Sequence, residues 1–286
     1  MSILLTDSSF GVREAPDAGA PLAAVPCPFS APYMPYASRE HLFFCCRSAR
    51  DCLCMRRKDH SECVRMPALP ALSDLCASPC GRYLYQLSGE ADCVHTRHTA
   101  TGDLLFSART GVFPRTMRLH PSGKELLVSG GAVNEAYLLR APELKRDATI
   151  RLRSACFGAD FWQGGLVLLC AAEGEDIQTM VYTLAPDSKR PRKLITLPGQ
   201  PGGLCMCPDG LSALLSTPDG LMKLDLPTGQ LRWNLPEWPL CMRICCRGGA
   251  ALISDTLTGQ VCLLRHEQPW FKRIICSGTD AQACFY

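Results

Sequence analysis

Short apolar segments alternate with polar turns along the whole chain. The segments are four to seven residues long, and they either alternate apolar with polar positions or are apolar throughout, as in Leu126-Leu127-Val128. Period-two alternation and short apolar runs bounded by turn residues predict strands, whereas a helix needs apolar positions three and four residues apart. No long segment has helical spacing. The pattern therefore predicts an all-β protein.

A Pro-x-Gly turn marks a repeated unit. The clearest copies are His120-Pro121-Ser122-Gly123 and Cys207-Pro208-Asp209-Gly210, each preceded and followed by an apolar stretch. Proline presets the first corner of such a turn, and glycine takes the positive φ that other residues avoid. A third copy ends at Gly81, and weaker copies end near Arg39 and at Gly164 and Gly248, so that successive units are 38 to 46 residues apart. A period near 40 residues with about four strands per unit is typical of a β-propeller rather than of helical repeats.

Six such units lie within the chain, and its two ends supply a seventh. Leu4-Leu5-Thr6-Asp7 matches Leu252-Ile253-Ser254-Asp255, so the chain starts in mid-blade, and residues 281–286 resemble an innermost strand. We therefore predict one domain, residues 1–286, that forms a seven-bladed β-propeller of four-stranded antiparallel blades. Residues 1–25 and 281–286 share the closing blade, and their pairing leaves no open sheet edge at the seam.

The units ending at Gly123 and Gly210, each with a following apolar strand, resemble the repeats of the YVTN and lactonase-like seven-bladed propellers. The resemblance extends in diffuse form over nearly the whole chain and implies the same blade geometry. It admits sugar-lactone hydrolases, a streptogramin-opening lyase and many binding proteins. None of their catalytic motifs can be transferred residue by residue, and the Trp-Asp ending of WD repeats is missing.

Composition and charge exclude several classes of function. With 47% hydrophobic and 20% charged residues the chain can build a core, and a net charge of +3 is too small for a nucleic-acid footprint. The first residues lack a basic, apolar signal segment, and no stretch approaches the roughly 20 apolar residues of a membrane helix. We expect a cytoplasmic monomer with no nucleic-acid or membrane partner.

Nineteen cysteines are an unusual number for such a chain. Without a secretion signal we expect reduced thiols, which pack as small hydrophobic side chains. The run from Cys45 to Cys63, which includes Cys52-Leu53-Cys54 and His60, also allows a zinc site. Because this run should form a buried hairpin, we favour core thiols, and we expect no metal and no cofactor. Analysis of the metal content would decide between the two interpretations.

The axial mouth, where loops enter the innermost strands, is the usual binding site of a propeller. Repeat alignment places Tyr36, Cys76, Arg118, Cys205, Arg243 and Cys284 at equivalent positions and puts Asp280 in a mouth loop. The candidate ligand-binding residues are Tyr33, Tyr36, Asp74, Arg115, Arg118, His120 and Arg243. The arginines could hold an anion, since their donors form a fork, or could form structural ion pairs such as Arg118 with Asp160. We favour the ion pairs.

Two hypotheses for function follow. The first is a binding propeller that uses its axial face for a protein or a small anionic ligand, and the second is a lactonase- or lyase-type enzyme acting on an anionic substrate. Unpaired arginines beside a base such as His120 or Asp74 would favour the enzyme, whereas paired arginines in a sealed mouth would contradict it. The catalytic residues stay unassigned.

Overall fold

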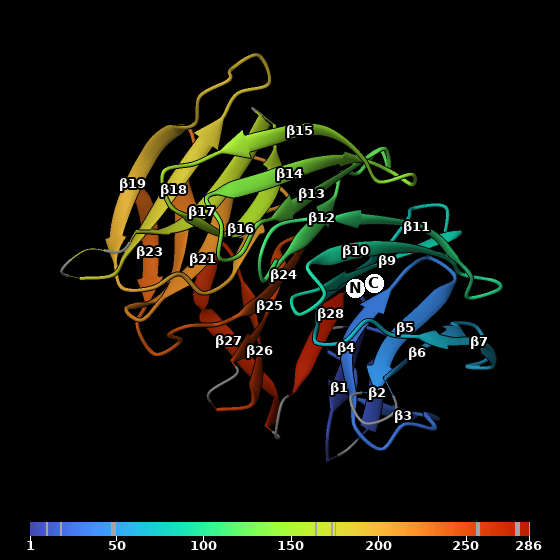
Figure 1. Ribbon diagram of the computed structural model, residues 1–286. Coiled ribbons are helices and arrows are strands. Elements are labelled where there is room, and N and C mark those ends of the chain that lie inside the picture. The colour runs from blue at the N-terminus through green and yellow to red at the C-terminus, as the bar shows by residue number, and fades with distance from the viewer. Residues whose placement is uncertain are drawn as a thin grey trace.

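The computed structural model describes residues 1–9, 11–17, 19–46, 50–163, 165–172, 174, 176–255, 258–277 and 281–285, with only the backbone of 270–272 and 277. These residues form seven four-stranded antiparallel sheets arranged in a ring, which is a seven-bladed β-propeller as predicted (Figure 1). No helix that could cross a bilayer occurs in the described part of the chain.

The inner half of each blade consists of an axial strand and its neighbour. The axial strands are β4 (Pro32–Ala37), β8 (Leu72–Ala77), β12 (Met117–Leu119), β16 (Ala155–Trp162), β20 (Leu204–Met206), β24 (Arg243–Arg247) and β28 (Gln282–Phe285). The second strands are β5 (His41–Cys46), β9 (Tyr83–Ser88), β13 (Glu125–Ser129), β17 (Gly165–Ala172), β21 (Ser212–Thr217), β25 (Ala250–Asp255) and β1 (Ile3–Asp7).

The outer half of each blade faces solvent on its last strand. The third strands are β6 (Asp51–Arg56), β10 (Cys93–His98), β14 (Glu135–Arg140), β18 (Gln178–Leu184), β22 (Gly220–Asp225), β26 (Gln260–Arg265) and β2 (Gly11–Ala15). The outermost strands are β7 (Glu62–Pro67), β11 (Leu104–Arg109), β15 (Lys145–Arg151), β19 (Arg192–Pro198), β23 (Leu231–Leu235), β27 (Gln268–Ser277) and β3 (Ala23–Val25). We number the blades 1 to 7 in the order of these lists.

The closing blade is assembled from both ends of the chain, as predicted. Its strand order is β28-β1-β2-β3, and Leu4 of β1 pairs with Cys284 of β28 in an antiparallel register. The pairing covers residues 3 to 6 against 282 to 285. The ring is thus closed by backbone hydrogen bonds inside one sheet, with β1 and β28 side by side (Figure 1).

The hydrophobic core lies between the blades. Second strands such as β21 and β25 are buried along their whole length, which explains why each contains a short apolar run, residues 213–215 and 250–253, rather than a period-two alternation. Within the described residues, one apolar cluster fills each contact between successive blades; Leu4 of blade 7, for example, packs in one cluster with Phe44 of blade 1. Each blade is therefore held by its neighbours on both faces.

The Pro-x-Gly turns join the axial strand of a blade to its second strand, as the repeat predicted. Gly123 has φ +73° and Gly210 has φ +67°, a region that side chains with a Cβ rarely adopt. The amides of both glycines donate to the carbonyl three residues earlier, His120 and Cys207. These turns set the register that points the axial side chains inward.

Candidate functional site

The axial strands surround a cavity of about 1130 Å³. Five of the seven candidate residues line it: Tyr36, Asp74, Arg115, Arg118 and Arg243. Burial raises the pKa of the Tyr36 hydroxyl, which keeps this side chain neutral. The cavity is large enough for a small organic molecule.

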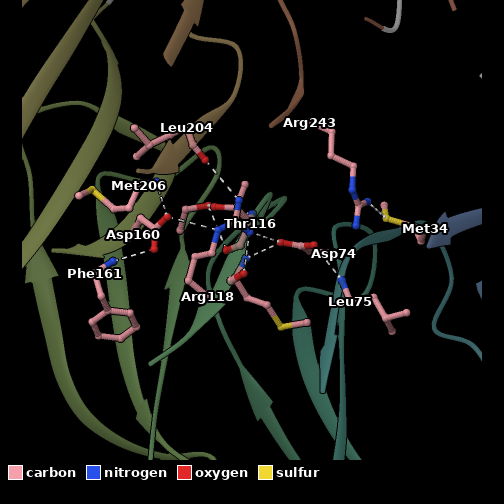
Figure 2. A network of polar contacts seen from close by, with 12 residues as sticks. Met34, Asp74, Leu75, Thr116, Arg118, Asp160, Phe161, Leu204, Met206 and Arg243 are labelled. Carbon is pink, nitrogen blue, oxygen red and sulfur yellow. Dashed lines mark hydrogen bonds and ion pairs between the residues drawn. The ribbon is translucent and has the colours of Figure 1, made fainter. Parts of the chain in front are cut away.

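Arg118 is neutralised inside the cavity. Its Nη1 lies 3.1 Å from Asp74 Oδ2, and its Nε lies 3.7 Å from Asp160 Oδ2 (Figure 2). Nη2 also donates to the carbonyl of Leu204 in blade 5 at 3.3 Å. Burial acts to lower the pKa of the guanidinium, but the two carboxylates outweigh it and raise that pKa. The expected ion pair between Arg118 and Asp160 is therefore present.

The two carboxylates also join neighbouring blades. Asp74 Oδ2 accepts a hydrogen bond from the amide of Met117 in the next blade at 2.9 Å. Asp160 Oδ2 likewise accepts from the amide of Met206 in the next blade, at 3.0 Å, while its Oδ1 accepts from Phe161. Burial raises the pKa of Asp160, although Arg118 and these two amides act against it. These contacts give Arg118, Asp74 and Asp160 a structural role.

Arg115 makes no ion pair with any carboxylate of the described residues. It lies in the loop before β12, its Cζ is 4.8 Å from the ring centre of Phe157, and its Nη2 is 4.0 Å from the sulfur of Met242. Burial lowers the pKa of Arg115, because no nearby opposite charge offsets the cost of removing the charged guanidinium from water. A thioether is a weak acceptor, so these contacts only partly replace water.

Arg243 is in a similar position on the other side of the mouth. Its Nη1 lies 2.8 Å from the Met34 sulfur and 3.5 Å from Gln282 Oε1, and its Nη2 donates to the Pro35 carbonyl at 3.3 Å. Figure 2 shows it apart from the Arg118 network. No carboxylate of the described residues forms an ion pair with it, and Asp280, which we expected in a mouth loop, lies outside the described residues.

The register corrects one expected equivalence. Arg118 pairs with Leu127, and Cys205 and Cys284 pair with the corresponding Leu214 and Leu4. In blade 6 the residue opposite the corresponding Leu252 is Cys245, whereas Arg243 pairs with Ser254. Arg243 is therefore not equivalent to Arg118 but lies two residues closer to the mouth. Arg115, in the loop before β12, precedes Arg118 by three residues.

The two remaining candidates are not among the described residues that line the cavity. The His120 ring lies with its Nδ1 2.7 Å from Ser122 Oγ and packs edge-on against Phe161, with 4.9 Å between ring centres. Tyr33 packs in the apolar cluster between blades 1 and 2. His120 therefore does not provide the base beside the arginines that a lactonase or lyase hypothesis requires.

Cysteine side chains are a major part of the cavity wall. Cys76, Cys205, Cys245, Cys246 and Cys284 line it, and burial raises the pKa of Cys76 and Cys284, which keeps these thiols protonated. The sequence pattern predicts the axial positions of Cys76, Cys205 and Cys284. It misses Cys245 and Cys246, because the pattern aligns blade 6 two residues away from its observed register. It also misses the mouth residues Met34, Phe157 and Met242, which carry no polar pattern.

The Cys45–Cys63 run packs mainly as core, as favoured. Cys45, Cys52 and Cys54 are fully buried, and His60 contacts Glu14 at 2.8 Å instead of turning toward the thiols. Cys54 and Cys63 instead approach His41, with their ligand atoms within 4.8 Å of one another. The metal interpretation of this run thus remains a hypothesis, with His41 in the place expected for His60.

Comparisons with known proteins identify the fold alone. No family model matches the chain. No curated protein matches it either. Among solved structures it is similar to Kuenenia stuttgartiensis hydrazine synthase, with a TM-score of 0.70, 15% identity, and coverage of 88% of this chain and 81% of that one. It is also similar to dihydro-heme d1 dehydrogenase NirN in complex with DHE, with a TM-score of 0.61 and 15% identity over 87% of this chain and 56% of that one.

Proposed function

We propose that this propeller binds a small organic anion in the mouth of its axial cavity, between Arg115 and Arg243. The observation that carries the proposal is the contrast between three arginines of one cavity. Arg118 has two carboxylates, whereas Arg115 and Arg243 contact an aromatic ring, thioethers and neutral oxygens. A charge held away from water without an opposite charge is costly, and a bound anion removes that cost.

The surroundings of the two arginines favour a carboxylate attached to an apolar group. Guanidinium donors match a carboxylate in a two-point contact. Phe157 and Met242 present apolar surface next to Arg115, and Phe113 at the same mouth is 61% exposed. The concave shape suits a small molecule better than a flat protein surface, so a protein partner at this face is the less supported form of the binding hypothesis.

Isothermal titration with benzoate, phthalate, citrate and inorganic phosphate, against neutral benzamide, tests the proposal. A carboxylate should bind, and the double variant Arg115→Met/Arg243→Met should bind it at least about tenfold more weakly, since each charge-assisted contact contributes about 1.5–3 kcal/mol. Arg140→Met removes an exposed arginine of an outer ion pair and should bind like the wild type. Equal binding of benzamide, or unchanged binding by the double variant, contradicts the proposal.

The proposal also covers the superfamily of the propeller and its cellular location, and it has one alternative. The Pro-x-Gly turns and their spacing support membership of the YVTN and lactonase-like propellers, and the free state of the cysteines supports a reducing, cytoplasmic location. The alternative is a lactonase- or lyase-type enzyme. Turnover of a lactone panel that disappears in the double variant would replace binding by this alternative.

A further inference from the structure

Three potential metal ligands from two blades converge at the contact between blade 5 and blade 6. Cys207 follows β20 in blade 5, Cys246 lies in β24 of blade 6, and His266 lies in the turn between β26 and β27. One ligand atom from each side chain lies within 4.8 Å of the other two. Ligands of a tetrahedral zinc ion are about 3.3–4 Å apart, as follows from zinc–sulfur and zinc–nitrogen bonds of about 2.0–2.3 Å. Small side-chain rotations would therefore bring this set into coordination.

The backbone of each ligand segment is already fixed. Cys207 donates its amide to Ser212 at 2.8 Å, within the Pro-x-Gly turn. His266 donates its amide to Gly249 at 3.2 Å, and its carbonyl accepts from Trp233 Nε1 at 2.9 Å. Cys207 is 3% exposed and His266 is 4% exposed. These hydrogen bonds thus hold Cys207 and His266 at a contact between two blades that is nearly inaccessible to solvent.

A buried ring nitrogen points to a missing partner. Nε2 of His266 is inaccessible to solvent and makes no hydrogen bond of ordinary geometry among the described residues, although the ring lies in contact with the Cys207 thiol. Buried polar atoms of native proteins nearly always have a partner, so this one needs an explanation. A lone pair on imidazole nitrogen is a preferred zinc ligand, and coordination would satisfy it.

The side chains of this group already contact one another. The thiols of Cys207 and Cys246 lie together, and the His266 ring and the Ser212 side chain also contact the Cys207 thiol. A cation that binds here would displace the thiol protons to solvent, so the affinity for zinc should depend on pH.

Cys205 offers a fourth ligand, although it lies outside the group of three whose ligand atoms are within 4.8 Å of one another. Cys205 of β20 and Cys207 both pack in the apolar cluster between blades 5 and 6, and the Cys205 thiol contacts that of Cys246. Cys205 and Cys246 also line the axial cavity, which gives an ion a path to the site. Three thiolates would give the occupied site a net negative charge. Lys223, which is buried, interacts electrostatically with His266 and also pairs with Asp209 and Glu267.

We propose that Cys205, Cys207, Cys246 and His266 form a tetrahedral site for one Zn²⁺ ion, which links blade 5 to blade 6. The proposal is independent of the anion site in the mouth. The second group of this kind is His41 with Cys54 and Cys63, of which Cys63 lies on an outermost strand and is only partly buried. It therefore serves as the matched control.

The test uses the full chain, purified without oxygen in the presence of a reductant and freed of metal with a chelator. Titration with Zn²⁺ should give one tightly bound ion per chain, counted by elemental analysis. Co²⁺ should give thiolate-to-cobalt charge-transfer absorption together with the intense d–d bands of a tetrahedral site. Zn²⁺ should also protect Cys207 and Cys246 from alkylation, which peptide mass spectrometry would show.

Variants locate the site. Cys207→Ser and Cys246→Ser should weaken Zn²⁺ binding more than about 100-fold, because loss of an outer-shell partner alone costs about 10–100-fold. His266→Cys keeps a ligand and should retain tight binding, and Cys54→Ser and Cys63→Ser should bind like the wild type. Circular dichroism of the metal-free proteins shows whether each variant is folded.

Four outcomes would overturn the proposal, and the first three concern metal binding. These are absence of a tightly bound ion in the wild type, cobalt spectra without thiolate charge transfer, and loss of binding in the Cys54 and Cys63 variants instead of the Cys207 and Cys246 variants. A disulfide among the blade 5 and 6 cysteines that forms in the wild type and, once reduced, leaves no zinc affinity would also overturn it. The wild-type spectra and the alkylation pattern decide even if a serine variant fails to fold.

Discussion

Removing the Arg118 guanidinium should leave Asp74 and Asp160 without their cation. The two carboxylates are 7% and 9% exposed, so water cannot replace the arginine fully. Loss of one partner of a buried ion pair costs about 3–5 kcal/mol. Because the Arg118 side chain keeps 29% exposure to the cavity, cavity water should offset part of the loss, and we expect about 3 kcal/mol for Arg118→Met.

The assay is chemical and thermal unfolding of Arg118→Met beside the wild type. At about 2 °C per kcal/mol for a chain of this length, Tm should fall by about 6 °C. Arg140→Met is the matched control: Arg140 lies 2.8 Å from Asp147, closer than Arg118 to either aspartate, but its side chain is 60% exposed. An exposed pair contributes at most about 1 kcal/mol, so the control should lose little stability.

The pH dependence gives a second readout. Burial already raises the pKa of Asp160, and Arg118 is one of the groups that act against this rise. Without Arg118 the folded-state pKa of Asp160 should rise further above its unfolded value. Stability from such a group is present below the unfolded pKa and is lost as pH rises through the folded pKa. The penalty of Arg118→Met should therefore be largest near neutral pH and shrink toward about pH 4.

Two results would refute this reasoning. One is a change below about 0.5 kcal/mol at pH 7, the range of an ordinary surface substitution. The other is a penalty that stays constant as pH falls, which would mean that the loss comes from packing and not from the uncompensated carboxylates.

Three further predictions concern other parts of the fold. Contact with Ser78, whose Oγ lies 3.3 Å from the thiol, lowers the pKa of the exposed Cys80 to about 7, so iodoacetamide labelling should rise with pH to a half-maximum near 7 and then level off. Gly131→Ala should destabilise by more than about 1 kcal/mol, because its Cβ would lie 1.7 Å from the Phe113 carbonyl oxygen at φ +65°. Phe44→Ala, which empties a fully buried position between blades 7 and 1, should cost about 3–5 kcal/mol in urea unfolding.

Each of these has a clear contrary result. A half-maximum of labelling near 9 would mean that Cys80 titrates as an ordinary thiol. Gly249→Ala is the control for Gly131, since nothing lies within 4 Å of its added Cβ, and equal losses in the two would contradict the clash. A loss below about 1 kcal/mol for Phe44→Ala would mean that the contact between the blades readily collapses around a smaller side chain.

The fold could be predicted because its determinants are local. The turn ending at Gly210 and the buried run of β21 occur within one unit, and each unit repeats them. The seam could be predicted for the same reason, since Leu4-Leu5-Thr6 carries the pattern of a second strand. The pairing of Arg118 with Asp160 followed from the order of neighbouring blades.

The site was less predictable because it depends on contacts between blades. In blade 6 the Arg247-Gly248 turn lacks the proline, so the repeat pattern was aligned two residues away and hid Cys245 and Cys246. Cys207 and His266 are 59 residues apart and belong to different blades, so no local spacing brings them together. Sequence alone could have drawn attention to Cys205-x-Cys207, which places two thiols on one face of a strand.

The shared blade also sets an order of events during synthesis. Strand β1 is synthesised before its inner neighbour β28, and residues 8–281 lie between the two strands along the chain. Until β28 is made, the inner edge of β1 has no partner inside its own sheet, and the contact between residues 3 and 285 must close a loop of nearly the whole chain. Between the synthesis of β1 and that of β28, this edge is therefore open to edge-to-edge pairing with other unfinished chains.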